Sequence, residues 1–446
     1  MDSKKILKKV LVELSRIIIG VTFTFSGFTK SVDPMGTTYK IQDYFTAFGF
    51  EAFNSLALPV AIALCVVEFS VGVFMLFGIY RKWTSRMALL IMIFMTPFTL
   101  YLAIFNPVSD CGCFGDAFVI TNWQTFFKNI ILLAAAIVLF FWHETITNLY
   151  TGKFYWLVAF YIIAFGIAFC VYNSNVEPVI DFRPYKIGAN LPELISVEEG
   201  KGDVYENVFI YEKNGEKKEF SDDNYPWQDS TWIFVDRINK LVKEGEKPQI
   251  TDFEINRLYF SPDRKEIEDE ENITSEVLES SNYTFLMIAY SLSEMNETYL
   301  SRFEDVNNYA KEYHYDFYCL TASSTTEILE WDDENPVNFI FCQTDSRTLK
   351  TMIRSNPGLI LLKNGVVINK WPDIRVPAEE QLSAPLDKLP LSQKIDTQEQ
   401  NKNTMLVLLS IFFIPLLLLT SLDLLIFRKK QPPMENSKKT TDNINS

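Results

Sequence analysis

Six long apolar stretches constrain this chain more than any other feature of its sequence. A helix needs about 17–25 apolar residues to cross a hydrocarbon core of roughly 30 Å. Lys128 interrupts the fourth stretch, but a lysine near a helix end can extend its ammonium to the membrane surface. No small-x-small cleavage site closes the first stretch, so we predict a retained helix. The chain is therefore predicted to cross a membrane six times, at residues 10–28, 56–80, 87–105, 123–142, 154–172 and 405–427.

Basic residues flank these stretches unevenly, which predicts their orientation. They cluster at residues 4–9, 81–86 and 428–430. With six spans all three clusters fall on one side, and cytoplasmic loops are enriched in lysine and arginine. We expect a multi-pass protein of the bacterial inner membrane, in contact with lipid, whose N- and C-termini are cytoplasmic.

Residues 173–403 then lie on the opposite, periplasmic side. They hold 44 acidic and 24 basic side chains, within a chain whose net charge is −15. A nucleic-acid binder needs a basic surface against phosphate, so this class of partner is excluded. Two histidines and six cysteines do not provide the usual spacing of a zinc module, and we expect no metal site.

The acidic segment has the pattern of a mixed α/β domain. Residues 205–211 and 231–235 have the composition of short strands. From residue 282 apolar strand runs alternate with helical spacing, and a proline precedes a final hairpin. The expected strands are 283–289, 317–320 and 338–342, the helices 296–313, 325–331 and 345–354, and the hairpin 359–370.

This order resembles that of a thioredoxin-like domain, and the resemblance implies that Pro357 takes that fold's cis-proline position. Redox-active members carry Cys-x-x-Cys at the start of the helix after the first central strand, where the helix dipole lowers the pKa of the nucleophile. Here that place reads Tyr290-Ser291-Leu292-Ser293-Glu294, without sulfur. We expect a redox-inactive domain that binds an exported client or redox protein.

The membrane half carries a more specific motif between the third and fourth stretches. It reads Asp110-Cys111-Gly112-Cys113-Phe114-Gly115-Asp116. Together with three further elements it resembles the four-helix DoxX/MauE group, and Cys-Gly-Cys-Phe-Gly points to the MauE branch. This resemblance covers residues 10–142 and implies a role in maturing disulfide-containing exported proteins. The further elements are Ser26-Gly27-Phe28-x-Lys30, Asp33-Pro34-x-Gly36, and Glu68 followed by Gly72 and Gly78.

Cys111 and Cys113 are the candidate redox pair. Two cysteines separated by one residue can close only a tight ring, and strained exposed disulfides tend to be labile or oxidising. Asp110 and Asp116 oppose this role, because neighbouring carboxylates raise thiol pKa values. Two interpretations stand: a thiol–disulfide oxidoreductase centre, and a structural disulfide that braces the loop. Cys170, near the exported end of the fifth stretch, is a candidate third thiol.

Three other cysteines have no predicted chemistry. Cys65 lies one helical turn from Glu68 and is expected to pack as a small hydrophobe. Cys319 and Cys342 lie in two expected strands, and the sequence is compatible with either a structural disulfide between them or two buried free thiols.

Glu68, near the middle of the second stretch, is the most costly residue to place in a membrane. Intramembrane carboxyl groups usually find a partner or stay protonated. Arg16, in the first stretch, is the predicted partner, and the alternative is a proton-handling group beside a quinone. Lys30 is expected to anchor to lipid headgroups or to hold Asp33.

The sequence thus predicts a membrane α-helical bundle, four helices of DoxX/MauE type plus two further spans, with an exported α/β thioredoxin-like domain. The sequence is compatible with two functions. In the first, Cys111 and Cys113 pass oxidising equivalents to exported proteins, with a quinone as candidate cofactor. In the second, the chain is a non-enzymatic membrane scaffold that binds a partner. The expected parts are residues 1–150 (four-helix domain), 151–174 (fifth helix), 175–281 (lead-in), 282–400 (thioredoxin-like), 404–428 (sixth helix) and 429–446 (cytoplasmic basic tail).

Overall fold

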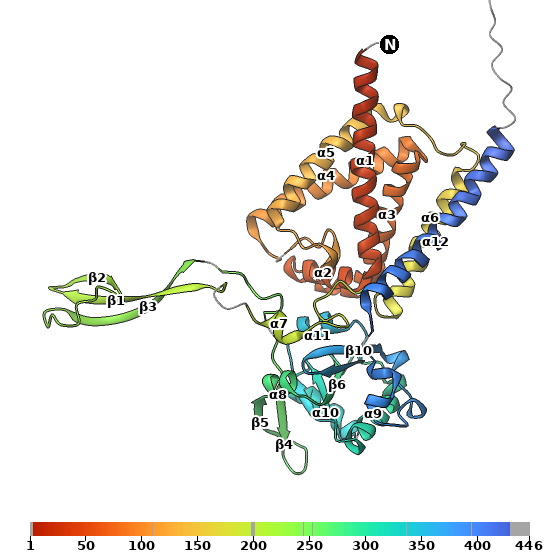
Figure 1. Ribbon diagram of the computed structural model, residues 1–446. Coiled ribbons are helices and arrows are strands. Elements are labelled where there is room, and N and C mark those ends of the chain that lie inside the picture. Colours follow the sequence, from red (N-terminus) through yellow and green to blue (C-terminus); the bar gives the residue numbers. More distant parts are fainter. Residues whose placement is uncertain are drawn as a thin grey trace, which may run out of the picture. The chain divides into compact units, whose positions relative to one another are not determined.

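The protein is described by a computed structural model over residues 3–108, 110–197, 201–243, 245–251, 253–335, 337–393 and 395–428. The chain divides into two compact units (Figure 1). The first combines Met1–Arg183 with Asp396–Ser446, and the second is Pro184–Ile395. The basic tail predicted at residues 429–446 lies outside the described residues.

The first unit is helical. Among the described residues, six helices are long and apolar enough to cross a membrane: α1, α3, α4, α5, α6 and α12. This confirms the six predicted apolar helices, and the chain is a multi-pass membrane protein. The helices of this unit are α1 (Ser3–Val32), α2 (Pro34–Ala47), α3 (Ala57–Phe77), α4 (Arg81–Phe105), α5 (Asn122–Trp142), α6 (Tyr155–Asn175) and α12 (Thr397–Asp423).

Helices α1 and α3 approach each other very closely, and two glycines make this approach possible. A Cβ atom on Gly27 of α1 would lie 2.3 Å from the backbone nitrogen of Phe69. A Cβ atom on Gly72 of α3 would lie 2.3 Å from the backbone nitrogen of Thr24. Small residues allow this close backbone contact between membrane helices. The α1–α3 contact therefore places the polar side chains of both helices directly against one another.

The short helix α2 begins directly after α1. Asp33 is its N-cap, and the carboxylate accepts a hydrogen bond from the backbone N–H of Gly36 at 2.9 Å. Pro34 occupies the first turn, where a missing N–H costs nothing. The Asp-Pro-x-Gly motif is thus a helix start, and it turns the chain back toward the loop between α4 and α5.

The second unit is a mixed α/β domain, as predicted. Its seven-stranded sheet has the order β10-β9-β6-β7-β8-β4-β5, in which β6, β7 and β8 are parallel and the other pairs antiparallel. The strands are β4 (Asn256–Phe260), β5 (Ile267–Asn272), β6 (Tyr283–Ile288), β7 (Asp316–Thr321), β8 (Phe341–Gln343), β9 (Gly358–Lys363) and β10 (Val366–Pro372). The helices are α7 (Leu191–Ile195), α8 (Thr274–Glu279), α9 (Leu300–Glu312), α10 (Thr325–Glu334) and α11 (Ser346–Met352).

Strand β6 is the centre of this domain because it is buried at every position. Phe285 and Met287 pack into the core on one face of the sheet, and Leu286 and Ile288 pack into the core on the other. Side chains alternate between the faces of a strand, so an uninterrupted apolar run is typical of a strand covered on both faces.

A separate three-stranded antiparallel sheet precedes this domain. It has the order β2-β1-β3 and consists of β1 (Val204–Lys213), β2 (Glu216–Ser221) and β3 (Ile233–Lys243). The strands expected at 205–211 and 231–235 overlap β1 and β3, whereas β2 was missed. The charged run Glu216–Ser221 lacks apolar alternation, and it forms a strand because the Asn214-Gly215 turn folds it onto β1.

Candidate functional site

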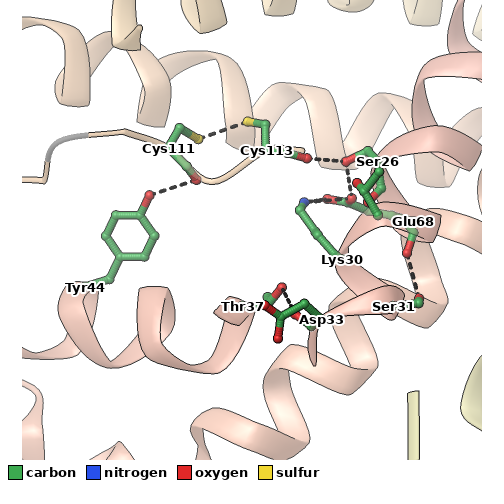
Figure 2. Close-up of polar contacts among 11 residues, drawn as sticks. Ser26, Lys30, Ser31, Asp33, Thr37, Tyr44, Glu68, Cys111 and Cys113 are labelled. Carbon is green, nitrogen blue, oxygen red and sulfur yellow. Dashed lines mark hydrogen bonds and ion pairs between the residues drawn. The ribbon is translucent and has the colours of Figure 1, made fainter. Parts of the chain in front are cut away.

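The loop between α4 and α5 brings the two cysteines of the Cys-Gly-Cys motif together. The Sγ atoms of Cys111 and Cys113 lie 3.0 Å apart, within hydrogen-bonding distance (Figure 2). Both residues are free thiols, and Cys113 is the more buried of the two. Gly112 between them has a φ of +64°, a left-handed conformation that glycine adopts without strain. The loop therefore holds a dithiol whose sulfur atoms already face each other.

Three side chains from α1 and α2 hold this loop. Lys40 forms an ion pair with Asp110, with Nζ 2.6 Å from Oδ2. The Tyr44 hydroxyl donates to the backbone carbonyl of Cys111 at 3.1 Å, and Ser26 Oγ lies 2.6 Å from the carbonyl oxygen of Cys113. The two thiols are thus held in place without a bond between them.

The two thiols have opposite acidities. The hydrogen bond from Cys111 lowers the pKa of Cys113 to about 6 against the effect of burial, and the cations Lys128 and Lys30 lower it further. The same hydrogen bond and burial raise the pKa of Cys111 well above its usual range. The arrangement therefore favours a thiolate on Cys113 beside a protonated Cys111.

The flanking acids do not have the predicted effect on this pair. The charge of Asp110 is compensated by Lys40. Lys128, which interrupts the fourth apolar stretch, extends toward the loop and lies 4.2 Å from the centre of the Phe114 ring. Positive charge therefore acts on Cys113, and the expectation that the neighbouring carboxylates raise its pKa is wrong.

A buried ion pair lies directly behind the loop. The Lys30 Nζ atom is 2.9 Å from Oε1 and 2.8 Å from Oε2 of Glu68 (Figure 2). Lys30 is 4% exposed and Glu68 6% exposed. The predicted Arg16–Glu68 pair is therefore wrong, and so are the predicted roles of Lys30 at lipid headgroups or at Asp33. The close α1–α3 contact brings Lys30, in the last turn of α1, to the carboxylate on α3.

Arg16 lies on α1, 14 residues before Lys30, which corresponds to roughly 21 Å along the helix axis. Its guanidinium pairs with Glu13 at 3.0 Å and donates to Thr147 Oγ1 at 2.8 Å. It also donates to the carbonyls of Met75 and Leu76, in the last turn of α3. Cations stabilise the C-terminal end of a helix, so Arg16 has a structural role at the opposite end of this bundle.

Ser26 connects the ion pair to the cysteine loop. Its Oγ lies 2.7 Å from Oε2 of Glu68 and 2.6 Å from the carbonyl oxygen of Cys113. A serine hydroxyl has one hydrogen, which it donates to one acceptor at a time. The contacts Lys30–Glu68–Ser26–Cys113 are thus continuous and join the buried ion pair to the backbone of the cysteine loop.

Cys170 lies in a second buried group. It shares an apolar cluster with Cys65 and Val66, and its thiol forms a hydrogen bond with that of Cys65. The structure therefore brings Cys170 of α6 together with Cys65 of α3, a pairing that the sequence analysis did not predict.

Segments of both units match known protein families. Residues 8–142 match the family model described as Methylamine utilisation protein MauE. These residues form a MauE family domain. Residues 205–244, which span β1 to β3, match a model described as Domain of unknown function (DUF8463). No curated protein and no solved structure matches the chain.

The MauE domain contains all the contacts of the cysteine loop described above. Its motif residues Ser26, Lys30, Glu68, Cys111 and Cys113 lie together, although they come from two helices and a loop. The sequence analysis missed Lys40 and Tyr44. Their spacing of four residues places them on one face of α2, but no local signal shows that this face meets the loop.

In the second unit, the segment after β6 meets the proline loop. The Asn356–Pro357 peptide bond is cis, and the Asn356 side chain donates to the carbonyl of Ser291 at 2.7 Å. The hydroxyl groups of Ser291 and Ser293 lie 3.2 Å apart. These contacts join the two segments but place no thiol between them.

Cys319 and Cys342 belong to opposite faces of the seven-stranded sheet. Cys319 of β7 packs into one core and Cys342 of β8 into the other. Burial raises the pKa of Cys319 above its usual range and that of Cys342 to about 12. The structural disulfide left open by the sequence is therefore excluded, and both are buried free thiols.

Proposed function

We propose that this chain is a membrane thiol–disulfide oxidoreductase that matures exported proteins, with Cys111 and Cys113 as its redox pair. The observation that carries this proposal is the 3.0 Å approach of the two sulfur atoms in a loop that other contacts already hold. The MauE match over residues 8–142 supports the choice of this domain. The MauE resemblance supports one part of this proposal, the maturation of disulfide-containing exported proteins.

The unequal acidities assign roles to the two sulfur atoms. A thiolate of a client protein attacks Sγ of Cys111, the more exposed member of a Cys111–Cys113 disulfide. The S–S bond breaks and Cys113 leaves as a thiolate, since a thiol of low pKa is the better leaving group. A second client thiolate then attacks its own mixed-disulfide sulfur. The client leaves with a new disulfide. The Cys111–Cys113 pair has gained two electrons and one proton, which Cys111 takes up, while Cys113 stays a thiolate and the second proton of the client is released to the surroundings.

A membrane quinone is the proposed final acceptor of these electrons. A quinone takes up two electrons and two protons when it is reduced. The buried Lys30–Glu68 pair and Ser26 fit this demand, because they can hold a proton beside the loop. Their proposed role is to move protons between the cysteine loop and the interior of the bundle.

The contacts of the loop weigh against a scaffold with a structural disulfide. A disulfide braces a loop that would otherwise lose its geometry. Here Lys40, Tyr44 and Ser26 hold both ends of the motif while the thiols are unbonded. A bond between Cys111 and Cys113 would add little to the stability of the loop, which favours a redox role.

The second unit is proposed to be a redox-inactive, thioredoxin-like domain that presents the client in the periplasm. Three features support this: the parallel pair β6–β7, the antiparallel hairpin β9–β10, and the cis-proline loop beside the segment after β6. This proposal places both termini in the cytoplasm of a bacterial cell and the chain in the inner membrane, following the positive clusters of the sequence.

The test is to trap the redox states of Cys111 and Cys113 in cells by acid quenching and alkylation. We expect an oxidised pair that becomes reduced when quinone synthesis is blocked.

Cys111→Ser and Cys113→Ser should each abolish oxidation of exported proteins as completely as the double change, because the effects of residues that act as a unit are not additive. Cys113→Ser should accumulate a mixed disulfide with a client, since the internal thiol that would release the client from Cys111 is gone. Undiminished oxidation in the double variant, at normal abundance, would overturn the proposal.

A further inference from the structure

A second pair of thiols lies between two helices of the first unit. Cys65 of α3 and Cys170 of α6 are both completely buried. Their side chains hydrogen-bond to each other and share a small apolar cluster with Val66. The two residues are 105 positions apart in the chain and come from separate helices, so their contact is a product of the tertiary fold.

The last two turns of α1 connect this buried pair to the cysteine loop. The Lys30 ammonium acts electrostatically on both Cys65 and Cys113. The next residue, Ser31, hydrogen-bonds to Cys170, and Ser26 contacts the carbonyl of Cys113. One turn of α3 separates Cys65 from Glu68, the partner of Lys30. The two thiol pairs therefore share one polar neighbourhood.

We propose that Cys65 and Cys170 form a buried dithiol–disulfide pair that exchanges electrons with Cys111 and Cys113. This inference rests on the proposed function of the loop pair. It assigns a joint redox role to Cys65, which was expected to be a core residue, and to Cys170, which was expected to be a third thiol. Packing alone is the competing explanation, because free cysteine often fills a core as a small hydrophobe. The two explanations differ in whether the Cys65–Cys170 pair ever changes its oxidation state.

The exchange proceeds through two displacements. The Cys113 thiolate attacks one sulfur of a Cys65–Cys170 disulfide, whose S–S bond breaks, and the other sulfur leaves as a thiolate that takes up a proton. The Cys111 thiol then loses its proton and attacks Cys113 in the mixed disulfide, which releases the remaining buried thiolate for protonation. The loop pair is oxidised to a disulfide and the buried pair is reduced to a dithiol. Two electrons are transferred between the pairs, one proton comes from Cys111, and the second proton comes from the surroundings.

The first experiment tests whether the buried pair can be oxidised at all. The full chain with Cys111, Cys113, Cys319 and Cys342 replaced by Ser retains only Cys65 and Cys170. Membranes that contain this variant are treated with diamide, denatured and labelled with a maleimide of high mass. We expect both thiols to be lost to labelling and recovered with dithiothreitol. In the control that also carries Cys170→Ser, Cys65 should stay labelled. Two labelled thiols after oxidation of the test variant would overturn the proposal.

The second experiment tests the exchange between the pairs. Cells are pulsed with dithiothreitol, the reductant is removed, and reoxidation of Cys111 and Cys113 is followed by alkylation. In the Cys65→Ala/Cys170→Ala variant we expect reoxidation at least tenfold slower than in the natural chain. The matched control is Cys319→Ala/Cys342→Ala, which also removes two buried thiols and should reoxidise at the normal rate.

The outcomes separate this inference from the proposed function. A normal rate in the Cys65/Cys170 variant overturns the relay and leaves the loop pair as a redox centre. A loop pair that never reoxidises in the natural chain overturns the proposed function itself. If the double Ala variant is not inserted into the membrane, the single change Cys170→Val keeps an apolar side chain at this position and tests the same step.

A separate variant tests for the intermediate of the exchange. In Cys111→Ser, peptide mapping should find a disulfide between Cys113 and either Cys65 or Cys170.

Discussion

The buried Lys30–Glu68 ion pair is the side-chain contact of the membrane unit whose loss is expected to be most costly. Both groups are almost completely buried, and their mutual attraction must offset the loss of hydration of two charges. Ser26 supplies a further hydrogen bond to the carboxylate. Such a pair is a weak source of stability, but removing one partner leaves an uncompensated charge.

We predict that Lys30→Met and Glu68→Gln each lower the free energy of unfolding by roughly 3–5 kcal/mol. The double variant should recover much of this loss, because no charge then remains unpaired. Unfolding in detergent by denaturant measures all three variants. The control cycle is Arg16→Leu with Glu68→Gln, whose effects should add because Arg16 binds elsewhere. Strong coupling in the control cycle and additivity in the first would restore the Arg16–Glu68 pair.

The low pKa of the Cys113 thiol can be tested through its reactivity. In the reduced protein, alkylation of Cys113 by iodoacetamide should rise to its plateau through about pH 6, whereas Cys111 should react only at high pH. Mass spectrometry resolves the two sites. Lys128→Gln should move the midpoint of Cys113 to higher pH, because a stabilising cation is lost. Lys82→Gln, at the start of α4, is the matched control and should leave the midpoint unchanged.

The sign of the linkage follows from the same shift. The Cys113 thiolate exists in the folded state above about pH 6, whereas an unfolded cysteine remains protonated up to about pH 8.5. Between these values the unfolded chain binds more protons, so the reduced protein gains stability as the pH rises. This contribution is lost as the pH falls through 6. A stability of the reduced protein that falls between pH 6 and 8, relative to Cys113→Ser, would contradict the assignment.

At the scale of elements, the contact between α1 and α3 decides where the polar groups meet. The backbone approach at Gly27 and Gly72 leaves no room for a Cβ atom on either residue. The same contact brings Lys30 to Glu68 and Ser26 to both Glu68 and the cysteine loop. Small residues on two helices therefore determine the chemistry of side chains one or two turns away.

We predict that Gly72→Ala separates α1 from α3 and destabilises the unit by about 1–3 kcal/mol, the usual cost of overpacking. The new methyl group would meet the backbone of Thr24, which cannot rotate away. Thermal unfolding in detergent measures the loss. Gly166→Ala in α6 is the control, because its Cβ atom would make only ordinary contacts with Val66 and Phe69 at 3.5–3.8 Å. Equal stabilities of the two variants would show that the helices can move apart freely.

The distribution of basic residues around the six apolar helices predicts the sidedness of the whole molecule. We predict that reporters inserted after Ser85 and at the C-terminus are cytoplasmic. A reporter inserted at Gly215, in the β1–β2 turn, should be periplasmic. Paired alkaline phosphatase and fluorescent protein fusions measure this. A cytoplasmic Gly215 reporter would place the cysteine loop in a reducing compartment and remove the basis of the proposed function.

The six membrane helices, the mixed α/β unit and the position of the cysteine motif could all be predicted from the amino-acid sequence. Each is written in a local pattern: apolar runs of membrane-spanning length, uninterrupted strand runs such as Tyr283–Ile288, and a motif within seven residues. Such features can be predicted from short segments, because burial of apolar side chains imposes a characteristic spacing of apolar residues within each helix or strand. The strand β2 was missed for the same reason, since its charged residues carry no apolar alternation.

Which polar groups are partners could not be predicted from the sequence, because it depends on how the helices and strands pack. Arg16 and Lys30 lie on one helix, and both are cations available to Glu68, but the close contact of α1 with α3 selects Lys30. The Cys65–Cys170 contact depends on how α3 packs against α6, and the separation of Cys319 from Cys342 depends on the register of β7 and β8. The energy of an ion pair or hydrogen bond falls steeply with distance, and these distances are set by packing between elements that are far apart in the chain.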